Sequence, residues 1–280
     1  MEPFQKKYFD IGSMKMHYID EGLGQPLMLL HGNPTWSYCF RNLISCFSGS
    51  NRVIAPDHIG MGLSDKPQDA DYSLSFHINN LTKLIDGLGL KDMILVVHDW
   101  GGPIGFGYAV DHVEAIKKIV ILNTAAFPHE HIPKRLDLCR GRLGKLLIQR
   151  MNAFAWAATF MCTVKKMSRE VRKMYLAPYN SFCNRIGPYS FVKDIPMSES
   201  HRSWQLIISI ESKIPEIRSD VLILWGRKDF VFTELFFNRW RAFYPGARAV
   251  LYDDAGHYVI EDKTNEVIKE IEDFIDQGGY

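Results

Sequence analysis

The stretch Leu95-Val96-Val97-His98-Asp99-Trp100-Gly101-Gly102 decides the fold of this 280-residue chain. The apolar, β-branched run at residues 94–97 predicts a buried strand, and the glycine pair opens a new helical pattern. Asp99 stands at the break. In a sharp strand–turn–helix corner of this kind, the turn residue is strained and exposed, and small neighbours let the helix approach the strand. The sequence therefore predicts that Asp99 occupies the position of a nucleophile.

An aspartate at this corner favours displacement chemistry. A carboxylate has a reference pKa of about 3.9, so it is ionised at neutral pH without help from a base. It is a weak nucleophile toward carbonyls, but it displaces a leaving group from an sp3 carbon and forms an alkyl ester that water can attack. The simpler interpretation is that Asp99 only caps the helix, which is a common role for Asp.

Composition predicts a soluble globular enzyme with one large domain, with or without an insertion. Apolar residues make up 46% of the chain and charged residues 23%, and the net charge of +1 argues against a nucleic-acid binder. No apolar run approaches the ~20 residues of a membrane span, and residues 1–10 lack the apolar core of a signal peptide. We therefore expect a cytoplasmic protein without an integral membrane segment. The five cysteines have no C-x-x-C spacing and are expected to be reduced, and no pattern indicates a metal or cofactor.

Strand and helix patterns alternate along most of the chain. Residues 14–21 are predicted to form an antiparallel edge strand. Apolar runs predict further strands at 26–30, 53–55, 119–122, 221–225 and 249–251, and helical spacing predicts helices at 74–88, 101–112 and 264–275. This alternation indicates an α/β fold with a mostly parallel, doubly wound sheet.

The alternation stops between residues 127 and 215, where helical, aromatic and basic stretches replace the strand patterns. The simplest arrangement is a helical cap of residues 128–215 inserted into a core of residues 1–127 and 216–280. Such a cap would cover the carboxyl ends of the strands and keep water from a substrate. Phe154, Trp156, Phe160 and Met161 could line a long apolar slot in it, or simply form the core of the cap.

Two further polar residues follow strands at the same edge of the sheet. Asp229 comes after the strand at 221–225, and His257 comes after the last strand. The order nucleophile, acid, histidine is typical of a triad in a fold of this kind. We expect His257 to activate water toward an ester on Asp99, and Asp229 to orient the imidazole.

Asn33 and Trp100 are the predicted anion-binding residues. Their backbone amides are placed to form an oxyanion hole. Their side chains add an amide N–H and an indole N–H, which together could hold a departing halide or carboxylate. The alternative is that Asn33 is a turn residue and Trp100 belongs to the core.

Three motifs resemble those of haloalkane dehalogenases, which are α/β-hydrolases with an inserted helical cap. They are HGNPTWSY at 31–38, PDHIGMGLSDKP at 56–67 and HDWGG at 98–102. Asn33 paired with Trp100, and an acid placed late at Asp229, are similar to the third subfamily of that group. The resemblance spans nearly the whole chain and implies an Asp99-His257-Asp229 triad.

Four other segments resemble the β-lactone decarboxylases of bacterial long-chain olefin biosynthesis. They are NTAAFP at 123–128, YLAPY at 175–179, DIP at 194–196 and HYVIEDK at 257–263. These enzymes open a four-membered lactone and release an alkene and carbon dioxide. Other dehalogenases carry a glutamate where this chain has Asn123, which favours Asp229 as the acid.

Four functions are compatible with these residues. The first is a β-lactone decarboxylase, and the second is a haloalkane dehalogenase. An epoxide hydrolase would need two cap tyrosines, for which Tyr175, Tyr179 and Tyr189 are available. A binding protein that has lost turnover would have no use for all three triad residues. The sequence leaves the substrate, its chain length and the carbon that is attacked undecided.

The predicted cap is strongly basic. Residues 134–173 contain two acids, Asp137 and Glu170, and eleven basic residues, namely Lys134, Arg135, Arg140, Arg142, Lys145, Arg150, Lys165, Lys166, Arg169, Arg172 and Lys173. Such a run is usually a solvated face. Because the whole chain is nearly neutral, this segregated charge could also dock a partner enzyme of an olefin biosynthesis assembly or a membrane surface that carries the hydrophobic substrate.

Overall fold

The computed structural model describes residues 4–128 and 139–277. Eight strands form one sheet in the order β1-β2-β4-β3-β5-β6-β7-β8. The strands are β1 (Lys7–Ile11), β2 (Met14–Glu21), β3 (Pro26–Leu30), β4 (Arg52–Pro56), β5 (Met93–Asp99), β6 (Ile116–Thr124), β7 (Asp220–Gly226) and β8 (Arg248–Tyr252). The sheet from β4 to β8 is parallel, and β2 is antiparallel to both of its neighbours. The structure thus confirms the predicted α/β class.

The strand β2 is antiparallel as predicted, but it is not at the edge of the sheet. β1 pairs along its outer side, from Lys7 opposite Tyr18 to Ile11 opposite Met14. The prediction of an edge strand at 14–21 is therefore wrong. β1 has mixed polarity, and only Ile11 in it is buried, so it lacks a continuous apolar run.

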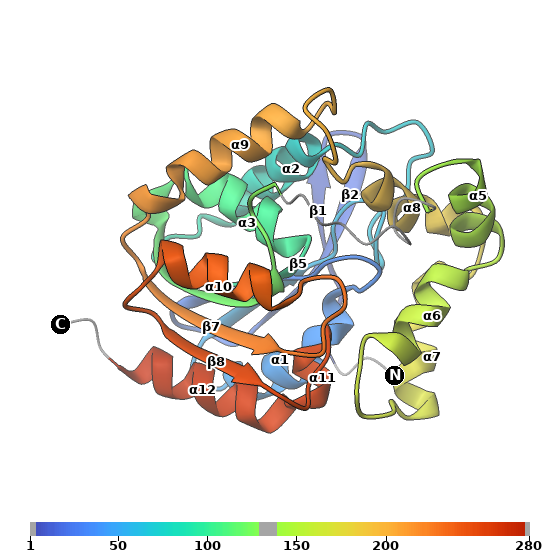
Figure 1. Ribbon diagram of the computed structural model, residues 1–280. Helices are drawn as coiled ribbons and strands as arrows, with labels where there is room; N and C mark the ends of the chain where they lie inside the picture. The colour runs from blue at the N-terminus through green and yellow to red at the C-terminus, as the bar shows by residue number, and fades with distance from the viewer. Residues whose placement is uncertain (1–3, 129–138, 278–280) are drawn as a thin grey trace.

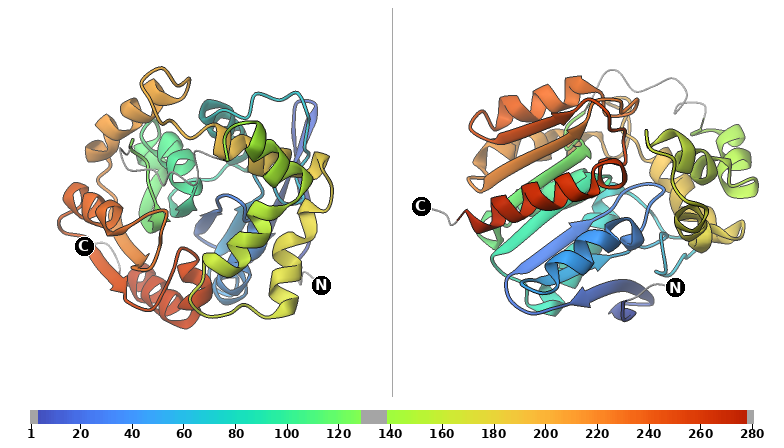
Figure 2. Two further views of the ribbon diagram at one scale, coloured as in Figure 1. Left: turned by 45° about the vertical axis from the view of Figure 1, so that its right-hand side comes forward. Right: turned by 90° about the horizontal axis from the view of Figure 1, so that it is seen from below.

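Helices cover both faces of the sheet (Figures 1 and 2). One face carries α1 (Arg41–Phe47), α11 (Val259–Asp262) and α12 (Thr264–Asp276), and the other carries α2 (Leu74–Leu88), α3 (Gly101–Ala109), α9 (Trp204–Lys213) and α10 (Glu234–Phe243). The central strand β5 is buried along its whole length. Its side chains alternate between the two cores, since Leu95 packs in one and Val96 in the other. Burial on both sides explains its continuous apolar sequence.

A separate layer of helices lies at the end of the sheet to which the arrows of β7 and β8 point (Figure 1). It contains α5 (Arg142–Lys145), α6 (Ala153–Met161), α7 (Arg169–Leu176) and α8 (Ile186–Lys193). The helix α9 falls inside the range predicted as cap, yet Ile207 and Ile210 join the core of α3, and Lys213 pairs with Asp111 beyond α3. The division into a core of residues 1–127 and 216–280 and a cap of residues 128–215 stays a prediction. In the described part of the chain, no helix has both the length and the apolar character needed to cross a bilayer.

Candidate active site

The corner between β5 and α3 holds Asp99 in a strained conformation. Its φ of 51° lies in the left-handed region, which residues other than glycine rarely adopt. Close approach requires small neighbours: a Cβ on Gly101 would collide with the Leu30 carbonyl oxygen, and one on Gly32 would collide with the Asp99 carboxylate. The hydroxyl of Thr124 donates to the Asp99 carbonyl. These contacts fix Asp99 at the carboxyl edge, between β3 and β6.

Two backbone amides bind the Asp99 carboxylate. The Asn33 N–H donates to Oδ1, and the Trp100 N–H forms a second backbone hydrogen bond to the group. Burial raises the pKa of Asp99 above its ordinary range, and it outweighs the opposing effects of His257 and the two amides. The carboxylate is thus held in one orientation while it is largely removed from water, and this favours attack by its other oxygen.

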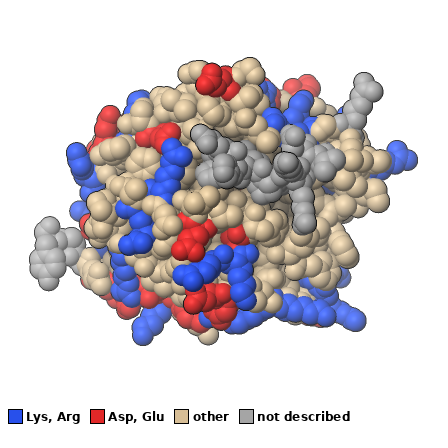
Figure 3. Space-filling model, viewed as in Figure 1, with Lys and Arg blue, Asp and Glu red and all other residues tan. Residues whose placement is uncertain are grey.

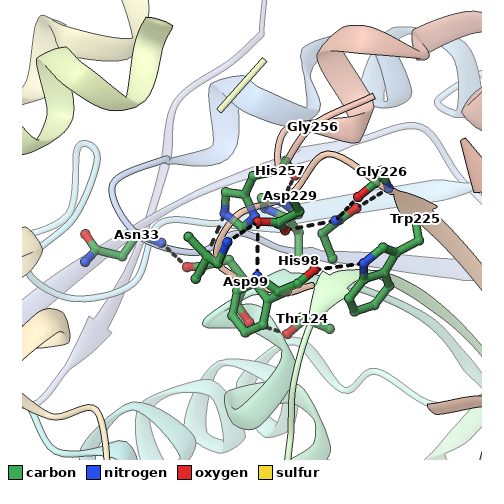
Figure 4. A network of polar contacts seen from close by, with 12 residues as sticks. Asn33, His98, Asp99, Thr124, Trp225, Gly226, Asp229, Gly256 and His257 are labelled. Carbon is green, nitrogen blue, oxygen red and sulfur yellow. Dashed lines mark hydrogen bonds and ion pairs between the residues drawn. The ribbon is translucent and has the colours of Figure 1, made fainter. Parts of the chain in front are cut away.

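His257 lies between two carboxylates (Figure 4). Its Nδ1 is 2.8 Å from Asp229 Oδ2, and its Nε2 is 3.6 Å from Asp99 Oδ2. Burial by itself would lower the pKa of His257, but Asp229 and Asp99 together raise it. The structure therefore brings the three predicted side chains together, and the two carboxylates favour the protonated form of His257.

The Asp229 carboxylate is held by neighbours on both sides. Its Oδ1 accepts hydrogen bonds from the N–H groups of Val231 (2.7 Å) and Phe232 (3.0 Å). Its Oδ2, which faces His257, also accepts from Asn123 Nδ2 at 2.9 Å. These donors replace the hydrogen bonds that the buried carboxylate would otherwise make to water.

The side chain of Asn123, in β6, forms hydrogen bonds both to Asp229 and to the backbone of Gly226 at the end of β7. Besides its bond to Asp229, Nδ2 donates to the Gly226 carbonyl (3.2 Å), and Oδ1 accepts from the Gly226 N–H (2.9 Å). From the sequence, Asn123 was only a position where a glutamate is missing, and this bridging contact was not predicted. The signal available was a polar residue near the end of a buried strand.

Buried polar residues hold the backbone around His257 and Asn33 by hydrogen bonds. His98 Nε2 lies 2.9 Å from the backbone carbonyl of His257, and burial keeps the pKa of His98 well below its ordinary range. On the facing loop, the His58 N–H donates to His31 Nε2 at 3.1 Å. The Asp57 carboxylate accepts from the Ser37 N–H at 2.7 Å. These bonds fix the loop that carries Asn33, and none of them was predicted.

The side-chain donors of Asn33 and Trp100 are placed differently from their backbone amides. In Figure 4 the Asn33 amide points away from Asp99, and its Nδ2 donates to the Pro188 carbonyl at 3.1 Å. A primary amide has two N–H groups, so one remains for a bound anion. The Trp100 indole N–H makes no hydrogen bond to another residue in the described part of the chain. Both side chains line the same cavity as Asp99.

The cavity above Asp99 has a volume of about 350 Å³ and is almost entirely apolar. Its walls include Phe154 and Met161 from α6, together with Val192 and Phe236. Trp156 and Phe160, which we expected beside them, do not line it. Asn33, Asp99, Trp100 and His257 also line it. Of these, Asn33 and His257 both lie next to the Asp99 carboxylate (Figure 4).

The tyrosines proposed for an epoxide hydrolase do not line this cavity. The Tyr175 hydroxyl donates to Glu261, the Tyr179 hydroxyl donates to the Thr35 carbonyl, and the Tyr189 hydroxyl donates to the Arg140 carbonyl. Among the described residues that line the cavity there is no pair of phenols to protonate an alkoxide, so the epoxide hydrolase alternative gains no support from this geometry.

The strand–helix corner, the sheet order and the inserted helices together define an α/β-hydrolase. The family described as alpha/beta hydrolase fold matches residues 25–264. The cis-3-alkyl-4-alkyloxetan-2-one decarboxylase of Shewanella oneidensis is 43% identical and covers 98% of this chain and 89% of its own. The protein of the same name from Xanthomonas campestris is 39% identical, with 98% and 97% covered.

Haloalkane dehalogenases are also similar. Haloalkane dehalogenase 2 of Mycobacterium tuberculosis is 28% identical over 95% of this chain and 93% of its own. The structure of the haloalkane dehalogenase DbeA from Bradyrhizobium elkani has a TM-score of 0.90 at 22% identity, with 97% of each chain covered. The chain therefore belongs to the alpha/beta hydrolase fold family, and it is an enzyme of the group that contains these dehalogenases and decarboxylases.

Proposed function

We propose that this enzyme is a β-lactone decarboxylase that converts a cis-dialkyl β-lactone into a cis-alkene and carbon dioxide. The observation that carries the proposal is 43% identity, over 98% of the chain, to a protein named for decarboxylation of such an oxetanone. The shape of the site supports it. An apolar cavity whose polar groups cluster around Asp99 suits a molecule with two alkyl chains and one small polar ring.

In the first step, the free oxygen of Asp99 attacks the sp3 ring carbon that carries the ring oxygen. A carbon–oxygen bond forms to Asp99, and the carbon–oxygen bond of the ring breaks, with its electron pair remaining on the substrate as a carboxylate. Relief of ring strain favours this opening. The remaining amide N–H of Asn33 and the indole N–H of Trp100 would bind the new carboxylate, as anion donors do in preorganised sites.

In the second step, the substrate carboxylate leaves as carbon dioxide. The electron pair of the broken carbon–carbon bond forms the alkene, and the bond to Asp99 breaks and returns its pair to the aspartate. Attack from the back places the ester oxygen opposite the carboxylate, so elimination keeps the alkyl groups cis. Neither water nor a proton is consumed.

The remaining residues hold charge and orientation during both steps. The Asn33 and Trp100 backbone amides keep Oδ1 in place and stabilise the charge that Asp99 regains. The imidazolium of His257, oriented by Asp229, stabilises the anion that is present at every stage. The apolar walls exclude water, which would otherwise hydrolyse the ester to a hydroxy acid.

Haloalkane dehalogenation is the second candidate, because the same Asn33 and Trp100 donors could bind a halide. One assay decides between the two. The purified protein is given a cis-dialkyl β-lactone and, separately, dibromoethane, and alkene and bromide are measured. We expect alkene from the lactone at a rate far above any bromide release. Bromide release without alkene formation would overturn the proposal.

A further inference from the structure

The helix α6 has apolar side chains on two opposite sides. Phe154 and Met161 line the substrate cavity. Trp156 and Phe160 lie instead in an outer groove, where their side chains are 57% and 42% exposed. A surface helix of a globular protein normally keeps its outer side polar. The outer side of α6 is therefore available for contact with something other than water.

Exposed apolar residues are concentrated around this helix. The described part of the chain has fourteen large apolar residues that are exposed, and eight of them fall between residues 143 and 182. These eight are Leu143, Leu146, Met151, Trp156, Phe160, Met161, Val164 and Phe182. Figure 3 shows mostly uncharged atoms at this end of the molecule, bordered by Lys and Arg. Such a concentration indicates an interaction surface.

Basic side chains border the apolar ones. The outer groove between α6 and α7 is lined by Trp156 and Phe160 on one side and by Arg169, Arg172 and Lys173 on the other. The Arg172 guanidinium lies 4.5 Å from the centre of the Phe160 ring. Between residues 139 and 182 the sequence has nine basic residues and one acid. Lys134, Arg135 and Asp137 of the predicted basic run lie outside the described residues.

We propose that this α6–α7 face, defined by the groove residues, binds the surface of a bilayer that contains anionic lipids. Tryptophan and other apolar side chains beside clustered lysine and arginine are typical of proteins that lie in a membrane interface. A second copy of this chain would place like charges opposite one another. An acidic partner protein is the other occupant with complementary charge, and the experiments below distinguish it by testing whether lipid alone is bound.

The position of α6 gives this contact a purpose if the proposed function is correct. One side of the helix faces the lipid and the other faces the cavity, so a dialkyl substrate dissolved in the bilayer would have a short path to Asp99. The proposal of membrane binding is argued only from the surface residues of α6 and α7. It is therefore tested without substrate, and its outcome is independent of the reaction that the enzyme catalyses.

The first experiment measures sedimentation of the full chain with phosphatidylcholine vesicles, with and without phosphatidylglycerol. We expect binding that needs the anionic lipid and weakens as salt is raised. The double variant Arg169→Glu/Lys173→Glu should bind more than tenfold more weakly. The matched variant Lys91→Glu/Lys117→Glu changes exposed residues at the amino ends of β5 and β6, and it should bind like the parent.

The second experiment measures how brominated lipids quench the total tryptophan fluorescence of the protein, to which Trp156 contributes as one of six tryptophans. We expect quenching that disappears in Trp156→Phe and remains in Leu235→Ala, which changes an equally exposed apolar residue on α10. Unchanged thermal unfolding shows that each variant is folded. Three results would overturn the proposal: no vesicle binding, equal binding by both charge variants, or capture of a partner protein through this face without any affinity for lipid.

Discussion

Replacing His257 by Phe separates the two reactions open to this site. In a dehalogenase, water must attack the ester on Asp99, and a positioned general base speeds such a step by about 10²–10⁴-fold. That factor corresponds to roughly 2.7–5.4 kcal/mol of barrier. In the decarboxylase mechanism, the ester is removed by the electrons of the departing carboxylate. No base takes part, so this contribution is absent.

The electrostatic role of His257 sets the remaining loss. At 3.6 Å between Nε2 and Asp99 Oδ2, an imidazolium and a carboxylate attract each other by roughly 4–5 kcal/mol at an effective dielectric constant of about 20. During attack, the negative charge passes from Asp99 to the substrate carboxylate and stays in the cavity. Most of the attraction therefore cancels between ground state and transition state. We expect alkene formation to fall by less than about 100-fold, or roughly 2.7 kcal/mol.

The assay combines alkene detection with intact-protein mass spectrometry. The variant should form alkene from the lactone without an accumulating adduct, and it should form a stable adduct on Asp99 with a bromoalkane. Phe232 already stacks on the His257 ring at 5.6 Å, so a phenyl ring has a matching neighbour. An adduct that accumulates from the lactone, or a loss of alkene formation beyond about 100-fold, would refute the reasoning.

Three further outcomes are expected. Asp99→Ala should abolish turnover, and residual activity above background in a purified sample would contradict a covalent mechanism. The pKa of Asp99 is raised in the folded protein. The stability that protonated Asp99 contributes is therefore complete below the pKa of the unfolded state, and it is lost as pH rises through the pKa of the folded state. Asp99→Asn should therefore unfold at a higher temperature than the parent at neutral pH but not at acid pH. As pH is lowered, protonation of Asp99 should reduce the parent's kcat/KM, and this loss should begin at a higher pH than for an ordinary aspartate. Asn123→Leu removes the acceptor of the Gly226 N–H and one donor to Asp229. At about 1–3 kcal/mol for each of these two buried groups, it should lower the free energy of unfolding by roughly 2–6 kcal/mol. An unchanged denaturant midpoint would show that the bridge is dispensable.

The sequence predicted the parts of the fold that depend on local pattern. The corner at Asp99 is marked by a buried strand that meets two glycines, and α2 ends where Gly89 adopts the left-handed conformation. Asp229 and His257 could be placed because parallel strands carry their following loops to one edge of the sheet. The strand β1 was missed because it has no apolar run. The helical spacing of residues 204–213 does not show which surface α9 packs on.

The finer geometry depends on contacts between distant residues, which no local pattern shows. Asn123 meets Asp229 across 106 positions, and the Asn33 amide meets the Pro188 carbonyl across 155 positions. Such bonds follow from the sheet order and from how α8 is seated over the loop. In the same way, the spacing along α6 predicts apolar sides but not which of them faces the cavity.

The apolar walls of the cavity have a kinetic consequence. If the proposed function is correct, the alkene product keeps both alkyl chains of the lactone and loses only the polar ring atoms, so the walls that include Phe154, Met161 and Val192 would hold the product about as firmly as the substrate. Bound alkene would then delay each new cycle after the chemistry is finished. The first turnover would appear as a burst, and added long-chain alkene would act as a competitive inhibitor whose strength rises with chain length.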